Sequence, residues 1–236
     1  MKFVVLLSFL FLSCSKMSSD EVDQSKIFTS YALTYNAEMD EVYAKATFFV
    51  DKMSKAFTYL ELTKGSEVSL NGQKLEVQDG LGKGLSFEYS TTLKARNLDQ
   101  AFVFRYINND DKVFENTFYL IESPSLKELI PTIELDGFST LTLEKDSLPE
   151  RGNLYFNLRD QNERSLKSLP IPFEQVSSEG EASFKMDNQG FRRPFTRKGE
   201  IEICSGQENK NIKAPKAGGL LMNTSCSQSY GVLILN

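Results

Sequence analysis

The sequence VSLNGQKLEV, residues 68–77, carries the clearest local signal of secondary structure in this chain. Apolar and polar residues alternate on both sides of Asn71-Gly72. An Asn-Gly pair between two alternating arms is typical of a two-residue type I′ turn, because both turn residues need a positive φ. The stretch therefore predicts a β-hairpin.

The same alternation recurs about every ten residues on both sides of this hairpin. In VYAKATFFV, residues 42–50, every second residue from Val42 to Val50 is apolar and shares one face. A second hairpin is expected from residues 101–107 and 113–121. We interpret Asn108–Asp111 between them as its turn rather than as an oxygen-rich cation site. Strands at this spacing predict an antiparallel sandwich, similar in outline to the immunoglobulin fold.

The turn-rich stretch Ser123-Pro124-Ser125 is the expected boundary between two domains. Beyond it the β pattern resumes at about residue 132 and ends in an apolar strand at residues 230–235. We therefore expect an all-β chain with two tandem antiparallel β-sandwich domains, at residues 27–123 and 124–236.

The N-terminal fourteen residues have a different character. Lys2 is followed by an apolar run from Phe3 to Leu12 that only Ser8 interrupts. This run is too short to span a bilayer, which takes about 20 apolar residues, and a positive start with a short apolar core is the secretory pattern. The sequence FLSC at residues 11–14 resembles the lipobox of bacterial lipoproteins.

That resemblance implies that Cys14 becomes the first mature residue and carries lipid, palmitate included. It covers residues 1–14 only and implies nothing about the fold that follows. A cleaved secretion signal without lipid and an uncleaved anchor are the alternatives. Because Ser15 and not Asp follows Cys14, the resemblance favours an outer-membrane or surface location in the cell envelope. Residues 15–26 are polar, and we expect a flexible tether there.

The chain has three cysteines, Cys14, Cys204 and Cys226. If Cys14 takes lipid, an even pair is left in an oxidising compartment, and we expect a Cys204–Cys226 disulfide. The chain has no histidine. A zinc site is therefore disfavoured, and so is a thiol nucleophile that an imidazole would activate.

A basic segment is the one sharp candidate for binding. Residues 185–216 hold eight Lys or Arg against four Asp or Glu, in a chain whose net charge is −5. Arginine pairs well with carboxylate and phosphate, so the segment is either a surface for an anionic partner (lipid, glycan or acidic protein) or a solvated loop. The candidate residues are Arg192, Arg193, Arg197 and Lys198.

Composition argues against other functions. The net charge of −5 disfavours a nucleic-acid partner. Sequence alone selects no catalytic pair among 32 acidic residues, and no cofactor motif is visible. We expect a non-enzymatic, membrane-anchored envelope lipoprotein that acts as a binding, adhesion or structural module. The alternatives are an accessory or assembly factor that docks on another envelope protein, and a carbohydrate-active hydrolase.

Overall fold

The structure is a computed structural model, and its described part is almost entirely β. It describes residues 16–51, 58–80, 86–95, 97, 99–127, 132–134, 138–144, 153–160, 165–171, 176–178, 181–187 and 198–235. These residues form nineteen strands and two 3₁₀ helices, η1 (Ser19–Glu21) and η2 (Gln24–Lys26), with no α-helix among them. The predicted all-β fold class is confirmed. The described residues contain no helix with the length and apolar character that a membrane crossing requires.

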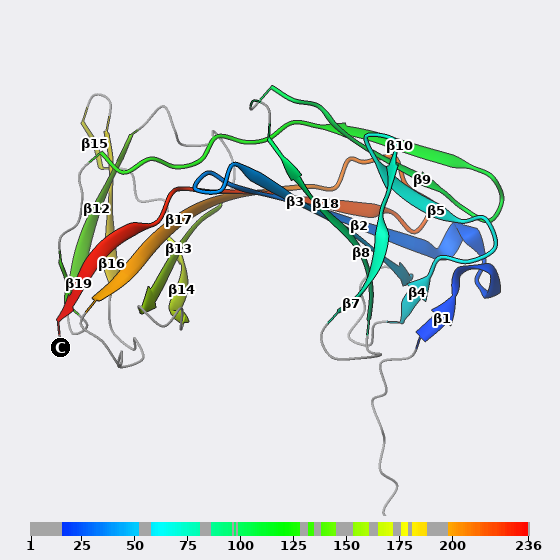
Figure 1. Cartoon of the computed structure of the whole chain (residues 1–236), viewed down its shortest axis with the longest axis horizontal. Coiled ribbons are helices and arrows are strands. Elements are labelled where there is room, and N and C mark those ends of the chain that lie inside the picture. Colours follow the sequence, from blue (N-terminus) through cyan, green and yellow to red (C-terminus); the bar gives the residue numbers. More distant parts are fainter. Residues whose placement is uncertain are drawn as a thin grey trace, which may run out of the picture.

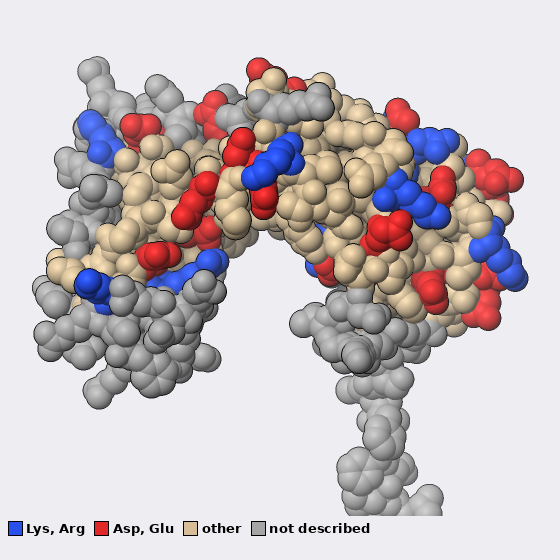
Figure 2. Space-filling view, in the orientation of Figure 1, with Lys and Arg blue, Asp and Glu red and all other residues tan. Residues whose placement is uncertain are grey.

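The largest sheet has twelve strands and bends into an arch (Figure 1), with a hollow beneath it (Figure 2). Its main path runs β1-β4-β3-β2-β18-β17-β13-β14. Strands β8 and β7 continue it from β3, and β19 and β11 from β17. The bounds are β1 (Lys16–Ser18), β2 (Ile27–Asn36), β3 (Glu41–Val50), β4 (Tyr59–Glu61), β7 (Glu76–Gly80), β8 (Ser86–Lys94), β11 (Thr132–Glu134), β13 (Asn153–Asp160), β14 (Ser165–Ile171), β17 (Lys198–Asn209), β18 (Gly219–Cys226) and β19 (Tyr230–Leu235).

Two smaller sheets lie over the two ends of the arch (Figure 1). One has four strands in the order β10-β9-β5-β6, and the other has three in the order β12-β16-β15. Their bounds are β5 (Glu67–Leu70), β6 (Gln73–Lys74), β9 (Phe102–Ile107), β10 (Val113–Phe118), β12 (Phe138–Glu144), β15 (Val176–Ser178) and β16 (Glu181–Asp187).

The core of the first half lies between the large sheet and the four-stranded sheet. Phe48 of β3 packs on Tyr106 of β9, with ring centroids 4.6 Å apart. Tyr31 of β2 stacks on Phe104 of β9 at 4.7 Å. These four side chains have no exposed surface, and burying each contributes roughly 1.5–3 kcal/mol. The two layers therefore pack as a sandwich.

The alternation of apolar and polar residues predicted the buried face of β3 correctly. Val42, Ala44, Ala46 and Phe48 are all fully buried, whereas Tyr43 between them is 39% exposed. Successive residues of a strand point to opposite faces, so period-two alternation marks the face that loses water. The predicted strand and its inner face are confirmed.

The predicted hairpin at residues 68–77 has the expected turn but a divided second arm. Asn71 and Gly72 have φ values of 50° and 80° between β5 and β6. After two paired residues the chain turns at Leu75, which is 2% exposed, and continues as β7 beside β8 in the large sheet. The second arm thus passes from one layer of the sandwich to the other, which corners of β-sandwiches commonly do.

A domain boundary was expected between residues 123 and 124, but the large sheet contains strands from both sides of it. Strand β18, which sequence position assigns to the second domain, runs parallel to β2 and pairs with it along its whole length. This pair, together with β1–β4 and β11–β19, is parallel, whereas only antiparallel pairs were expected. Alternation predicts that a segment is a strand, but it does not say which strand lies beside it.

Residues 16–26 are ordered, although the polar composition of residues 15–26 predicted a flexible tether. Strand β1 pairs with β4, and the side chain of Ser19 is fully buried. Gln24 is 8% exposed; its Nε2 donates to the carbonyl oxygen of Ser19 at 2.7 Å, and its Oε1 accepts from Asn109 N at 3.0 Å. The tether prediction is wrong here because polar residues that find hydrogen-bond partners can be buried.

An extended segment, residues 119–127, connects the two smaller sheets across the large one (Figure 1). We call it the crossing segment. Side chains of β17 and β18 hold it: Ser205 Oγ donates to Glu122 O at 3.1 Å, and the Ser123 and Ser225 hydroxyls lie 2.6 Å apart. At its far end, Lys127 N donates to Thr142 O of β12 at 3.0 Å.

Candidate functional site

Four of the residues singled out from the sequence lie outside the described residues. This is so for Cys14, the expected lipidation site, and for Arg192, Arg193 and Arg197 of the basic segment. Lys198, the last member of that group, is described; it is the exposed first residue of β17. The lipid anchor and the anionic-partner surface therefore stay predictions.

The predicted Cys204–Cys226 disulfide is present, with a sulfur–sulfur distance of 2.08 Å. The two residues face each other across β17 and β18 and are 4% and 7% exposed. Strand β17 pairs with β18 from Cys204 onward and with β19 before it. The bond therefore lies where the large sheet passes from its N-terminal strands to its C-terminal strands.

Glu202 lies beside this disulfide and is 8% exposed. Asn157 Nδ2 donates to its Oε2 at 3.1 Å, and Arg159 Nη2 donates to the same oxygen at 3.4 Å. Donor atoms of Glu202, Cys204 and Cys226 lie within 4.8 Å of one another, the arrangement a metal ion would need. The two sulfurs are bonded to each other, however, and the thiolate is the form that ligates metal. In the oxidised protein this cluster offers only the carboxylate.

The turn at Asn108–Asp111 joins β9 to β10, as predicted. Asn108 is 2% exposed, and its Oδ1 accepts from Asp110 N at 3.1 Å and from Lys112 N at 2.9 Å. The Asp110 carboxylate pairs with Lys112 Nζ at 3.7 Å. The Asn108 oxygen thus stabilises the backbone of the turn.

The surface charges that Figure 2 shows are of both signs and interspersed. Lys45 pairs with Glu88 at 2.8 Å, and Lys94 pairs with Glu41 at 3.1 Å. Burial by itself would raise the pKa of Glu88, but hydrogen bonds from Lys45 and Tyr43 outweigh it and lower that pKa. Such partly exposed pairs contribute roughly 0–1 kcal/mol each and define no site.

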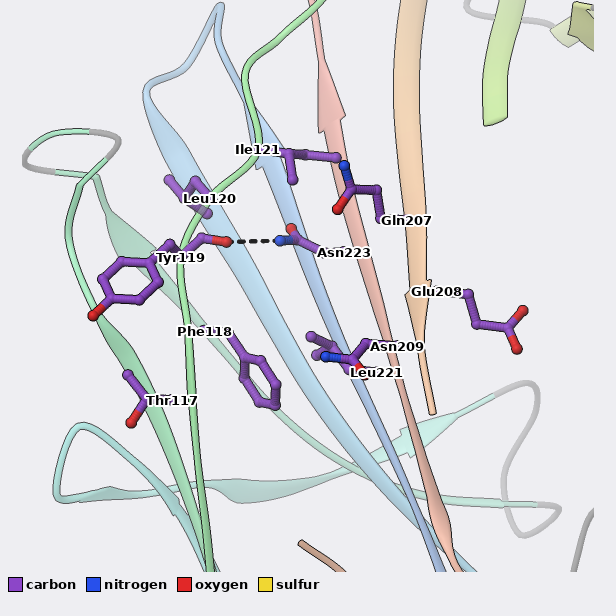
Figure 3. A pocket seen from close by; sticks show the side chains of 10 residues that line it. All are labelled: Thr117, Phe118, Tyr119, Leu120, Ile121, Gln207, Glu208, Asn209, Leu221 and Asn223. Carbon is purple, nitrogen blue, oxygen red and sulfur yellow. Dashed lines mark hydrogen bonds between the residues drawn. The ribbon is translucent and has the colours of Figure 1, made fainter. Parts of the chain in front are cut away.

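A groove of about 520 Å³ lies where the crossing segment begins (Figure 3). One wall is the end of β10 and the start of the crossing segment, and the other is formed by the end of β17 and the first part of β18. Ligand sites commonly measure about 300–1,000 Å³. The groove is lined by Thr117, Phe118, Tyr119, Leu120, Ile121, Gln207, Glu208, Asn209, Leu221 and Asn223.

Amide side chains occupy this groove on a face of the sheet that carries buried apolar residues farther along the strands. Strand β17 turns Ile201, Ile203 and Gln207 to one face, since every second residue shares a face. The two isoleucines are fully buried, but Gln207 lies in the groove. Asn223 of β18 is directly opposite Gln207, and Asn209 is opposite Leu221. The apolar inner face thus becomes polar between the two smaller sheets.

Among the described residues that line the groove, Asn223 is the one with a buried polar side-chain atom that lacks a hydrogen-bond partner. It is 7% exposed, and its Nδ2 donates to Tyr119 O at 2.7 Å (Figure 3). Its Oδ1 is buried and accepts no hydrogen bond from the described residues. A buried acceptor without a donor costs about 1–3 kcal/mol. The groove therefore favours any bound group that donates a hydrogen to this oxygen.

Sequence reasoning missed this site, although one signal was present. Leu221 sets the buried phase of β18, and Asn223 follows two residues later in the same phase. A polar residue at a position that alternation assigns to the apolar face is either buried with its hydrogen bonds satisfied or part of a binding site. The second wall belongs to a segment about 100 residues earlier in the chain, so the site could not be assembled from sequence spacing.

Fold and groove together define the class: an all-β protein of sandwich-like sheets with an open, mainly uncharged groove. No family model and no curated protein matches the chain. Three of the solved structures that resemble it are the I9–I11 tandem of titin, the adhesin InvE of Yersinia pseudotuberculosis, and SGBP-B of the Bacteroides ovatus mixed-linkage glucan utilization locus, in complex with a mixed-linkage heptasaccharide.

Their sequence identities to the chain are 10%, 10% and 7%, and their TM-scores are 0.22, 0.23 and 0.22. The matches cover 87%, 87% and 99% of this chain, and 66%, 60% and 69% of the other chains. This chain thus spans less than two thirds of the length of the titin and InvE chains. Likeness at these scores carries no argument about function.

Proposed function

We propose that this protein is a non-enzymatic module of the cell envelope, held to a membrane through lipid on Cys14, that acts by binding another molecule. The groove carries the binding part of the proposal. It is open and mainly uncharged, and it holds a buried amide oxygen without a donor. Those are properties of a recognition surface rather than of a packed core.

The disulfide supports the exported location. Disulfides persist in oxidising compartments and are rare in the cytosol. With Cys204 and Cys226 joined, Cys14 is the cysteine of the three that is left to carry lipid. Ser15 after it favours the outer membrane or the cell surface.

The chemistry of the groove supports a binding role over hydrolysis. Among the ten described residues that line the groove, Glu208 is the single carboxylate. A glycosidase of the usual kind needs two carboxyl groups about 5–10 Å apart. Glu208 is also paired with Lys210 at 2.7 Å.

Labelling with a palmitate analogue tests the anchor directly. The full chain is expressed in a bacterial host as wild type, Cys14→Ala and the matched control Ser15→Ala. We expect the label and membrane retention in the wild type and the control, and neither in Cys14→Ala. Equal labelling and fractionation of all three would overturn the lipid anchor.

A further inference from the structure

We propose that the groove binds an extended polypeptide segment of a partner protein, laid alongside residues 117–121 as an additional strand. This inference rests on the proposed function, because it names the kind of molecule that the module binds. The juxtaposition that carries it is an open backbone edge facing a row of amide side chains.

The crossing segment supplies the backbone edge. Strand β10 is an edge strand of its sheet, and the chain continues from it through the groove wall. In the described part of the chain, no hydrogen bond engages the backbone N–H of Leu120 or of Ile121. Consecutive residues of an extended segment point these groups to opposite sides, so one of the two lies on each edge of the segment. Exposed strand edges of this kind are where an extended peptide adds to a fold.

A side chain of β10 already holds a passing backbone segment of this chain. Lys213 N donates to Asn116 Oδ1 at 2.6 Å, and Asn116 Nδ2 donates to Lys213 O at 2.8 Å. One asparagine of β10 thus holds a passing backbone by both its N–H and its C=O. The groove begins at Thr117, the next residue of β10.

The side chain of Asn223 makes one of the two kinds of backbone hydrogen bond that Asn116 makes. Its Nδ2 already donates to Tyr119 O, and its Oδ1 has no donor among the described residues. The missing partner is a hydrogen donor, such as the backbone N–H of a bound strand. An extended strand presents N–H and C=O groups along one edge at every second residue, about 6.8 Å apart. Gln207 and Asn209 offer further amide donors and acceptors along the same side.

A glycan would also supply hydrogen donors, but the groove suits it less well. In Figure 3 the Tyr119 ring lies on the other side of the crossing segment from Asn223, so it provides no stacking platform facing the amides. The apolar contacts come from Phe118, Leu120 and Leu221, which are at most 8% exposed. The favoured occupant is therefore an uncharged extended segment whose side chains alternate between apolar and small polar.

The test selects ligands from a phage-displayed library of random ten-residue peptides on the immobilised full chain. Fluorescence anisotropy then measures the affinity of the selected peptide. Gln207→Trp fills the groove from a partly exposed position, and Asn223→Leu removes the amide. Thr224→Val is the matched control, because Thr224 is the next residue of β18 and faces away from the groove.

We expect Gln207→Trp and Asn223→Leu each to weaken binding at least tenfold, and Thr224→Val to leave it within twofold. N-methylation of the peptide at every second backbone nitrogen should abolish binding in one phase and spare it in the other, since a strand pairs through one edge. If Asn223→Leu fails to fold, Gln207→Trp and the methylated peptides decide the result.

Two results would overturn the inference. If an oligosaccharide array yields a ligand that Gln207→Trp abolishes while no peptide is enriched, the groove is a glycan site and the proposed binding function stands. If neither probe yields a groove-dependent ligand, the inference and the binding part of the proposed function both fall. Acylation of Cys14 is measured separately and is unaffected by either result.

Discussion

Replacing Gly199 with alanine tests the packing of the large sheet. Gly199 lies in β17, between β13 and β19. A β-carbon at this position would lie 2.5 Å from the backbone oxygen of Arg159 and 2.6 Å from Cδ1 of Ile234. Glycine within a strand often marks such a close approach of another backbone.

The expected cost follows from what can move. Overpacking a core costs typically about 1–3 kcal/mol. The Ile234 side chain can shift, but the Arg159 carbonyl belongs to a paired strand, and moving it weakens hydrogen bonds worth about 1 kcal/mol each. We expect Gly199→Ala to lower the free energy of unfolding by about 2–4 kcal/mol. For a chain of this size that lowers Tm by roughly 4–16 °C.

Gly231→Ala is the matched control, because Gly231 lies in the adjacent strand β19 and a β-carbon there would meet no atom within 4 Å. Its φ is not positive, so alanine should be neutral or stabilising by up to about 1 kcal/mol. Urea unfolding followed by circular dichroism measures both variants. Adding Ile234→Val to Gly199→Ala removes one of the two clashing atoms and should restore part of the loss. Equal stability of the Gly199 and Gly231 variants would refute the reasoning.

Three further perturbations probe other parts of the fold. Replacing Cys204 and Cys226 together by alanine should cost about 3 kcal/mol, because the disulfide closes a loop of sequence separation 22; an unfolding midpoint that reducing agent does not move would contradict this. Burial raises the pKa of Tyr89 from 10.0 to about 12, so this group stabilises the fold below pH 10 and loses that contribution as the pH rises to about 12. The slope is up to roughly 1.4 kcal/mol per pH unit, and Tyr89→Phe should reduce the measured slope of unfolding free energy over that range; an unchanged slope would count against it. Phe48→Ala should cost about 3–5 kcal/mol and Tyr43→Ala about 1 kcal/mol or less, since Phe48 is fully buried and Tyr43 is 39% exposed; similar urea midpoints would show that the buried face of β3 is assigned wrongly.

Predictions from sequence succeeded where the responsible physics is local. The turn at Asn71-Gly72 was predictable because a positive φ costs asparagine and glycine less free energy than other residues, and both adopt it here. The buried face of β3 was predictable because side chains alternate along every strand. Cys204 and Cys226 pair in the structure as cysteine count and an oxidising compartment predicted.

Predictions failed where strand partners are far apart in the sequence. They also failed where amino-acid composition was used to infer order without knowledge of the contacts. Residues 15–26 have the composition of a tether, yet Gln24 finds backbone partners and is buried. The boundary expected at residue 123 is a turn-rich break in the chain, but the sheet continues across it through β18 and β2. Neither outcome has a local signature.

Local sequence patterns were enough to predict that the chain is built of strands, which face of β3 is buried, where the hairpins turn and which cysteines pair. These properties depend on residues a few positions apart, or on the count of one residue type. The folded chain was needed to show that β18 lies beside β2 and that the crossing segment runs over β17 and β18. The meeting of Asn223 and Tyr119 in one groove follows from that arrangement. Each of these contacts joins residues about 80–190 positions apart. Strand pairing depends on backbone hydrogen bonds that every residue offers alike, so the side-chain pattern does not identify the partner strand.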